Sequence, residues 1–153
     1  MLYKETVERQ LFELIQQLCV EAELEEFVLV GGTALALQIG QRKSIDIDLF
    51  SAAAFDIDDM VVFLVKKYDY NIQNRFKNSL LGSIRNIKVD IISHQYQWLK
   101  PAKTAEGIRF AGLEDIAAMK LNAIMGNGSR LKDYADIAFF IITVFITANA
   151  VFF

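Results

Sequence analysis

The chain has 153 residues, of which 54% are hydrophobic and 23% are charged, so it can bury one core and is neither disordered nor fibrous. A single cysteine, Cys19, excludes a disulfide framework and a cysteine-built zinc site and indicates a cytoplasmic protein. The only histidine, His94, excludes metal sites that need two histidines, and a net charge of −3 gives no overall basic field for nucleic acid. We therefore predict a single domain over residues 1–153.

The first third of the chain alternates between helical and extended patterns. In chain order these predict a helix over residues 4–24, a strand over Phe27–Val30 that ends in Gly31-Gly32, a helix over Thr33–Ile39, a polar loop over residues 40–43 and a strand over Ser44–Phe50. The last strand alternates strictly, so Asp46 and Asp48 share one face and the opposite face carries Ile45, Ile47 and Leu49.

The rest of the chain predicts a helix, three strands, a loop and two helices. Their expected bounds are Asp56–Tyr68 with Asp56 or Asp58 as its cap, Asn71–Lys77, Leu80–Ile84, Ile87–Ile92, a loop over His94–Glu106, Glu114–Met125 ended by Gly126, and a last helix from about Arg130. Arg85-Asn86 predicts a tight hairpin between the last two strands. The order of elements predicts an α+β (α/β-like) domain, with helices flanking one mixed β-sheet.

The C-terminal stretch from Ile137 to Phe153 carries no charge. As a helix it would reach roughly 25 Å, short of the ~30 Å hydrocarbon core, so we predict a core helix that does not enter a membrane. Its many aromatic side chains predict a homo-oligomer that buries this segment: Phe139, Phe140, Phe145, Phe152 and Phe153.

Three carboxylates suggest a metal site. Asp46 and Asp48 would lie roughly 6.5–7 Å apart on one strand face, and a divalent cation between them would remove their repulsion. Oxygen ligands with this spacing suit Mg²⁺, which takes part of its shell from substrate phosphates. Asp90, on a neighbouring strand with Lys88 on the same face, would add a second metal ligand or accept a proton from a hydroxyl. The alternative is the solvated face of an edge strand.

The glycine turn upstream of these acids suggests a phosphate site. Gly31 and Gly32 let the backbone approach an anion, the following helix presents free N–H groups, and Thr33 adds a hydroxyl. The pattern is neither a P-loop nor a dinucleotide fingerprint, and an ordinary tight turn is the alternative.

Together these residues resemble a known family. VGGTALAL (residues 30–37), RKSIDIDLF (42–50) and VDI (89–91) resemble the nucleotidyltransferase superfamily. GIRFA (107–111), LEDIAAMKLNAI (113–124) and SRLKDYADI (129–137) narrow the resemblance to the AbiEii/AbiGii branch, the toxin half of bacterial toxin–antitoxin and phage-defence (abortive infection) systems. The resemblance covers about residues 5–137. It implies a minimal nucleotidyltransferase fold, a nucleoside triphosphate donor, Mg²⁺ and a cognate antitoxin.

The resemblance also implies roles for residues. Catalytic roles fall to Asp46, Asp48, Asp90, Lys120 and Asp133, the first three of them as metal ligands, and nucleotide-binding roles to Gly31, Gly32, Thr33, Arg42, Ser44, Lys120, Lys132 and Asp136. Ser44, two residues before the first aspartate, would bind phosphate or be a modification site. Family members continue past this point with further helices, so the apolar C-terminus suggests a truncated copy.

Three functions are therefore open. The first is Mg²⁺-dependent transfer of a nucleoside monophosphate (NMP) from a triphosphate to a hydroxyl of RNA (tRNA) or protein, as the toxin of such a system. The second is a non-catalytic nucleotide-binding or oligomerising module, and the third is transfer of phosphate in place of NMP.

Two smaller features also have two interpretations. Tyr96 and Trp98 would stack on a base or pack beneath their loop, and a basic group would bind RNA or protect a sheet edge: Arg75, Lys77, Arg85 and Lys88.

Overall fold

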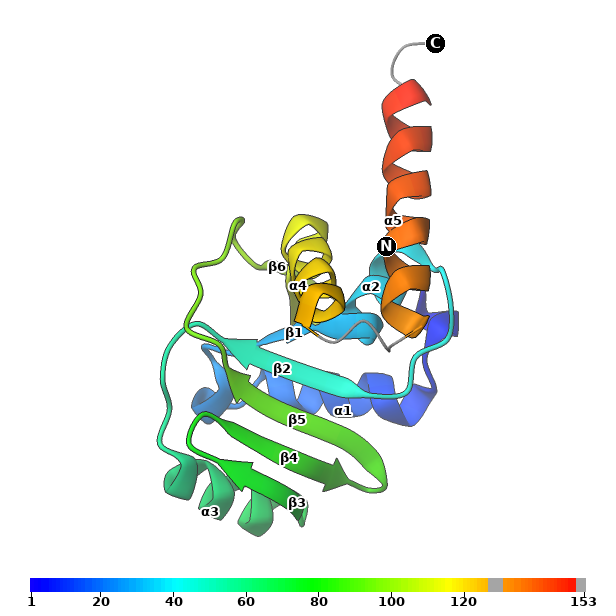
Figure 1. The fold of residues 1–153 in the computed structure, drawn as a ribbon. Helices are drawn as coiled ribbons and strands as arrows, with labels where there is room; N and C mark the ends of the chain where they lie inside the picture. Colours follow the sequence, from blue (N-terminus) through cyan, green and yellow to red (C-terminus); the bar gives the residue numbers. More distant parts are fainter. Residues whose placement is uncertain (127–130, 151–153) are drawn as a thin grey trace.

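A seven-stranded mixed sheet with helices on both faces organises the chain (Figure 1). The computed structural model describes residues 1–126 and 131–150, with side chains described as far as Val144. The elements are η1 (Lys4–Thr6), α1 (Arg9–Cys19), η2 (Ala22–Leu24), β1 (Val28–Val30), α2 (Gly31–Ile39), β2 (Ile47–Ser51), α3 (Ile57–Tyr68), β3 (Asn71–Phe76), β4 (Ser79–Ile84), β5 (Ile87–Ser93), β6 (Lys103–Ala105), β7 (Ile108–Phe110), α4 (Leu113–Gly126) and α5 (Leu131–Ala150). The strand order is β3-β4-β5-β2-β1-β7-β6, which confirms the predicted α+β class.

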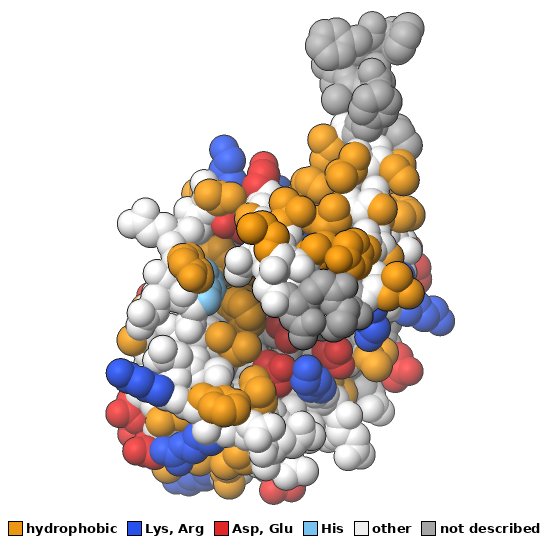
Figure 2. All heavy atoms as spheres, in the orientation of Figure 1, with side chains coloured by type: hydrophobic (Ala, Val, Ile, Leu, Met, Phe, Trp, Pro, Cys, Tyr) orange, Lys and Arg blue, Asp and Glu red, His pale blue; other side chains and the backbone are white. Residues whose placement is uncertain are grey.

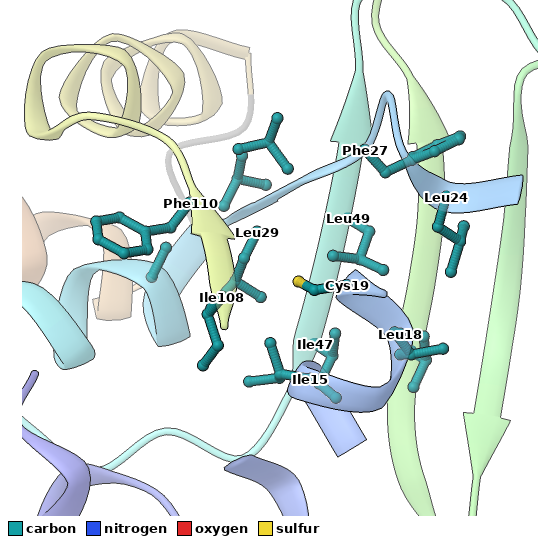
Figure 3. Close-up of a cluster of buried hydrophobic side chains, with 14 of the residues drawn as sticks. Ile15, Leu18, Cys19, Leu24, Phe27, Leu29, Ile47, Leu49, Ile108 and Phe110 are labelled. Carbon is teal, nitrogen blue, oxygen red and sulfur yellow. The ribbon is translucent and has the colours of Figure 1, made fainter. Parts of the chain in front are cut away.

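The alternation of β2 and β5 separates the core from the polar face. Ile47 and Leu49 are buried on the face that packs against Ile15 and Leu18 of α1 (Figure 3). Because successive side chains of a strand point to opposite faces, Asp48 on β2 and Asp90 on β5 point the other way, toward α4. One face of the central strands therefore builds the core, and the other is left for polar groups.

The N-terminal helix is shorter than predicted. The single helix expected over residues 4–24 is wrong: α1 spans Arg9–Cys19 between two 3₁₀ turns, and the backbone is extended at Val7 and Glu21. Arg109 of β7 donates hydrogen bonds to the carbonyls of Cys19 and Leu24, which holds the chain in its turn after α1. These are tertiary contacts that helical periodicity does not contain.

The acidic strand begins later than predicted. β2 starts at Ile47, and Ile45 is 65% exposed, so its assignment to the apolar face was wrong. The reason is local hydrogen bonding: the Ser44 N–H donates to the Thr6 carbonyl at 2.8 Å, and the Thr33 hydroxyl bonds to the Asp46 carbonyl. These bonds hold residues 44–46 out of the sheet ladder.

The turns of the second half follow the sequence closely. Asp56 caps α3 by accepting the Asp59 N–H at 2.9 Å, and Arg85 and Asn86 both adopt positive φ in the β4–β5 hairpin. The long loop expected over His94–Glu106 is wrong at its end, because Lys103–Ala105 forms β6 and pairs with β7. The helix predicted over Glu114–Met125 runs one residue further at each end.

α5 extends away from the sheet at the C-terminal end (Figure 1). Its described apolar side chains include the exposed Phe139, Ile141, Ile142 and Val144, so the predicted core helix is wrong for this part, which projects beyond the elements it would pack against. Among the described residues, no helix combines the length and the apolar character needed to cross a bilayer. The predicted oligomer contact through Phe145, Phe152 and Phe153 lies outside the side chains that the structure describes, and burial of the apolar C-terminus stays a prediction.

Candidate active site

A cavity of about 900 Å³ separates the polar face of β2 and β5 from α4. This volume is at the upper end of the range of small-molecule pockets, which run from about 300 to 1,000 Å³. In Figure 2, acidic and basic side chains gather in the middle of this face, and hydrophobic side chains and the histidine lie to one side of them. The cavity therefore has a charged end and an apolar end.

Three carboxylates form the floor of the charged end. Asp48 and Asp90 are direct neighbours on the parallel strands β2 and β5, and Asp46 precedes β2. Asp90 is only 6% exposed; its Oδ2 lies 3.0 Å from Lys88 Nζ, whereas its Oδ1 is buried with no hydrogen-bond partner in the structure. A buried carboxylate oxygen without a partner is costly, so this atom is suited to a cation or a proton donor that arrives with a ligand.

The surroundings of Asp48 disfavour its charged form. Burial is the main cause that raises the pKa of Asp48 from 3.8 to about 6, and the negative charges of Asp90 and Asp46 add to it, against Lys88 and Lys120. A divalent cation beside Asp48 would favour its charged form and so lower this pKa. Within the described part of the chain, no three His, Cys, Asp or Glu side chains form a ready-made metal cluster. The adjacent carboxylates of Asp48 and Asp90 and the unpartnered Asp90 Oδ1 fit a Mg²⁺ ion that would take part of its shell from a substrate.

The glycine bend lies directly against these acids. Gly31, with φ of +72°, ends β1 opposite the start of β2, and a Cβ placed on it would lie 2.5 Å from Asp48 Oδ2. A Cβ on Gly32 would lie 2.4 Å from Arg42 Nη2 and 3.4 Å from Ser44 Oγ. Position 31 therefore requires glycine, whereas a side chain at position 32 would displace the Arg42 guanidinium, and the bend and the acids share one end of the cavity. Because α2 begins at Gly31, its first N–H groups are free to face an anion there.

A second group of charges fastens α4 and α5 to the loop after α2. Lys120 Nζ lies 2.7 Å from Asp133 Oδ1 and 2.8 Å from Asp136 Oδ2. Arg42 donates two hydrogen bonds to Asp136, at 2.8 and 3.0 Å, and Gln41 donates a third. Burial alone would raise the pKa of Asp136, but the bonds from Arg42 and Lys120 hold it below its ordinary value.

Most of the sequence-predicted site residues line this one cavity: Gly31, Gly32, Arg42, Ser44, Asp46, Asp48, Asp90, Lys120, Lys132 and Asp133. Two do not. Thr33 is buried, and its hydroxyl is hydrogen-bonded to Ser44 Oγ at 2.8 Å and to the Asp46 carbonyl. Asp136 is buried behind Arg42 and Lys120. Both therefore support the residues that line the cavity.

Sequence reasoning missed several residues of the cavity. The sequence placed Lys88 on the same strand face as Asp90 but did not predict their ion pair, because that contact depends on the rotamers of both side chains. The basic group that included Lys88 is not one patch, because Arg75 bonds to Asp58 of α3 and Arg85 to Gln17 of α1. Strand alternation could have placed Phe50 on the face of Asp48, whereas His94 and Asp115 carried no local signal, since a loop and a helix distant in sequence bring them to the cavity.

Comparisons with known proteins agree with this fold. Residues 13–76 match the sequence model of a family described as "Nucleotidyl transferase AbiEii toxin, Type IV TA system". An Aquifex aeolicus (strain VF5) protein called "Uncharacterized protein aq_aa25" is 34% identical over 120 residues, which make up 74% of this chain. The chain spans 57% of the length of that relative.

Three solved structures share the fold. JHP933 from Helicobacter pylori has a TM-score of 0.56 and 20% identity, covering 87% of this chain and 66% of its own. ANT(2")-Ia, solved in complex with adenylyl-2"-tobramycin, has a TM-score of 0.59 and 15% identity, covering 90% of both chains. The Megavirus polyadenylate synthase has a TM-score of 0.58 and 14% identity, covering 84% of this chain and 30% of its own. The predicted resemblance is therefore confirmed: residues 13–76 match the AbiEii nucleotidyl transferase toxin family, and the chain has a nucleotidyltransferase fold.

Proposed function

We propose that the protein is a Mg²⁺-dependent nucleotidyltransferase that moves NMP from a nucleoside triphosphate to a hydroxyl of RNA or protein. The observation that supports this most strongly is the close approach of the glycine bend to Asp48, whose neighbour Asp90 keeps a buried oxygen without a partner. A phosphate chain on the glycines would put its α-phosphate over the acids. The family match and the fold support nucleotidyl transfer as the reaction class.

The chain supplies groups for each part of such a reaction. Gly31, Gly32 and Ser44 would bind the β- and γ-phosphates, together with the free N–H groups of α2. Asp46, Asp48 and Asp90 would hold Mg²⁺, which when bound would neutralise charge that develops on the phosphates. Asp90, through its unpartnered Oδ1, would also take the proton of the attacking hydroxyl.

Bond making and breaking then balance without another reactant. The acceptor oxygen forms a bond to the α-phosphorus, its proton passes to Asp90, and the bond from the α-phosphorus to the bridging oxygen breaks. Pyrophosphate would leave with that electron pair toward the glycine bend, where Arg42 lies against Gly32, and Lys120 and Lys132 of the same cavity would add positive charge. Asp133 and Asp136 would hold Lys120 and Arg42 in position for this.

The test of the reaction uses a triphosphate labelled at the α-phosphate, incubated with the protein and with total RNA or cell lysate. We expect label in RNA or protein, loss of labelling with EDTA, and loss in Asp46→Asn. Asp58→Asn changes an acid on α3 that is 74% exposed, outside the cavity, and is the matched control. Label that is bound but never transferred would identify the non-catalytic module. Transfer from a γ-labelled donor alone would identify a phosphotransferase.

The description of the matching family supports a biological role as a toxin. We propose that the protein acts in the cytoplasm, arrests growth when it is expressed alone, and is relieved by a cognate antitoxin. Expression of the native chain beside Asp46→Asn tests this role, because only the native chain should arrest growth. Arrest by both proteins would contradict a toxic role that depends on transfer.

A further inference from the structure

The end of the cavity opposite the glycine bend is built from rings. This aromatic end consists of Phe50, Ile92, His94, Tyr96, Trp98 and Met119. The His94 ring is central: its centroid lies 5.5 Å from that of Phe50, 5.0 Å from Trp98 in an edge-on contact, and 5.8 Å from Tyr96 in a stacked contact. Tyr96 is nevertheless 71% exposed, so part of the cluster faces open space.

The loop that carries these rings is fastened to both walls of the cavity. Asp115 of α4 is buried and accepts the N–H groups of Leu99 and Lys100 at 2.7 and 3.1 Å. The His94 N–H donates to the Ser51 carbonyl, and the Tyr96 N–H donates to His94 Nδ1. His94 Nε2 is buried and has no hydrogen-bond partner in the structure. The rings are thus held in place before a ligand arrives, and His94 Nε2 among them is available for a hydrogen bond to a ligand.

The direction of the reaction assigns this end to the acceptor. β1 and β2 are antiparallel, and Val30 is paired with Asp48. The glycine bend after Val30 therefore lies toward the N-terminal end of β2, whereas Phe50 lies two residues toward its C-terminal end. Ile92 lies in the same way two residues past Asp90 on β5. The acids therefore lie between the glycine bend and the rings. In an in-line displacement the attacking oxygen enters opposite the leaving group, so an acceptor comes from the aromatic end when pyrophosphate leaves along the glycines.

The chemistry of this end favours a nucleobase. The described lining includes five cations, Arg42, Lys43, Lys88, Lys120 and Lys132, and none of them belongs to the loop that carries the rings. Exposed aromatic side chains bind single-stranded nucleotides by stacking on their bases, which is worth about 1–3 kcal/mol per base. A serine or threonine of a protein acceptor would offer no ring to this surface.

We infer that the aromatic end binds a base of the acceptor, next to the attacking hydroxyl, and that the acceptor is therefore RNA. The inference rests on the proposed function for the position of the acceptor. The binding itself can be measured without any transfer.

The experiment uses the fluorescence of Trp98, the only tryptophan of the chain. The full chain is titrated with ribotrinucleotides of A, C, G or U, with an abasic trimer of the same charge, and with each nucleoside triphosphate. We expect the ribotrinucleotides to quench Trp98 and the abasic trimer to bind at least about tenfold more weakly. Tyr96→Ala should weaken the affinity for the ribotrinucleotides by about tenfold and leave the affinity for triphosphates unchanged. Tyr134→Ala, which removes an exposed tyrosine from α5 outside the cavity lining, should change neither.

Two results would overturn the inference. If triphosphates quench Trp98 and only their affinity depends on Tyr96, the rings hold the donor base. If abasic and base-bearing trimers bind equally, the rings only pack beneath their loop. Quenching by RNA without transfer of label would support the base site and contradict the transferase, so the two failures are distinguishable.

Discussion

The cavity contains two groups of carboxylates whose charges are balanced differently. Asp133 and Asp136 meet Lys120, and Asp136 also meets Arg42 and Gln41. Among the described residues, the group of Asp46, Asp48 and Asp90 has one ion pair, between Asp90 and Lys88, and the pKa of Asp48 is raised to about 6. The first group, which we call the balanced group, has its counter-charges within the chain, and we expect it to serve stability. In the second, which we call the strained group, burial and then the neighbouring negative charges disfavour the ionised form of Asp48, and we propose that a bound cation relieves this.

The strongest test of this difference removes a charge from the strained group. Asp48→Asn should lower transfer by roughly 10²–10³-fold, because it deletes a cation ligand and an electrostatic group at the reacting phosphate. The same change should leave the metal-free protein equally or more stable, because it removes repulsion from Asp90 and Asp46. Initial rates and urea unfolding measure the two effects. A large loss of stability would place Asp48 among the structural acids.

The balanced group should give the opposite result. Asp136→Asn should lower the free energy of unfolding by about 3–5 kcal/mol, because it leaves the partly buried Arg42 and Lys120 with less negative charge. The comparison is Asp58→Asn, which breaks an exposed pair with Arg75 and should cost at most about 1 kcal/mol. Urea denaturation measures both variants, and equal effects would contradict a structural role for the buried network.

The pH dependence of stability should show the strained acid directly. The pKa of Asp48 in the folded state, about 6, is above its ordinary value of 3.8. As pH falls, Asp48 therefore takes up a proton in the folded protein before it does so in the unfolded chain. Metal-free protein should therefore gain stability, on the order of 2 kcal/mol, as pH falls from 7 toward 4, and lose it as pH rises again. The lowered pKa of Asp136 acts in the other direction, but its contribution is lost only as pH falls below about 4.

Thermal unfolding from pH 7 to pH 4.5, with and without Mg²⁺, measures this effect. Mg²⁺ should flatten the profile by stabilising the charged form of Asp48. The same profile in Asp48→Asn should be flat without the ion, and a persisting slope there would assign the effect to another group.

The smallest expected effect separates backbone strain from contact with the acids. Gly31 and Gly107 both adopt positive φ, at +72° and +78°, so alanine at either position should cost about 1–2 kcal/mol of stability. A Cβ at position 31 would also meet Asp48 Oδ2 at 2.5 Å, whereas at position 107 the nearest atom is 3.7 Å away. Gly31→Ala should therefore also reduce transfer, by about tenfold or more. Equal activity in the two variants would show that the bend does not position Asp48.

The residues that local patterns describe were the most predictable. Asp56 at its helix cap, Arg85-Asn86 in the hairpin and the alternation of β5 all follow from neighbours within a few positions, and the structure has each of them. The prediction was wrong for Ile45 and for the length of the first helix, where hydrogen bonds from Thr33 and Arg109 override the local pattern. Those donors are close in space but distant along the chain.

The sequence by itself determined which strand faces carry acids and where the chain turns at glycine, because side-chain alternation and glycine geometry are local properties. Only the tertiary structure decided which charges are satisfied. Lys120 and Arg42 turn to the α5 acids, Lys88 turns to Asp90, and a loop with no local pattern brings His94 and Trp98 to the far end of the cavity. Charge balance depends on which side chains meet through space, and that is set when the helices and the sheet pack together.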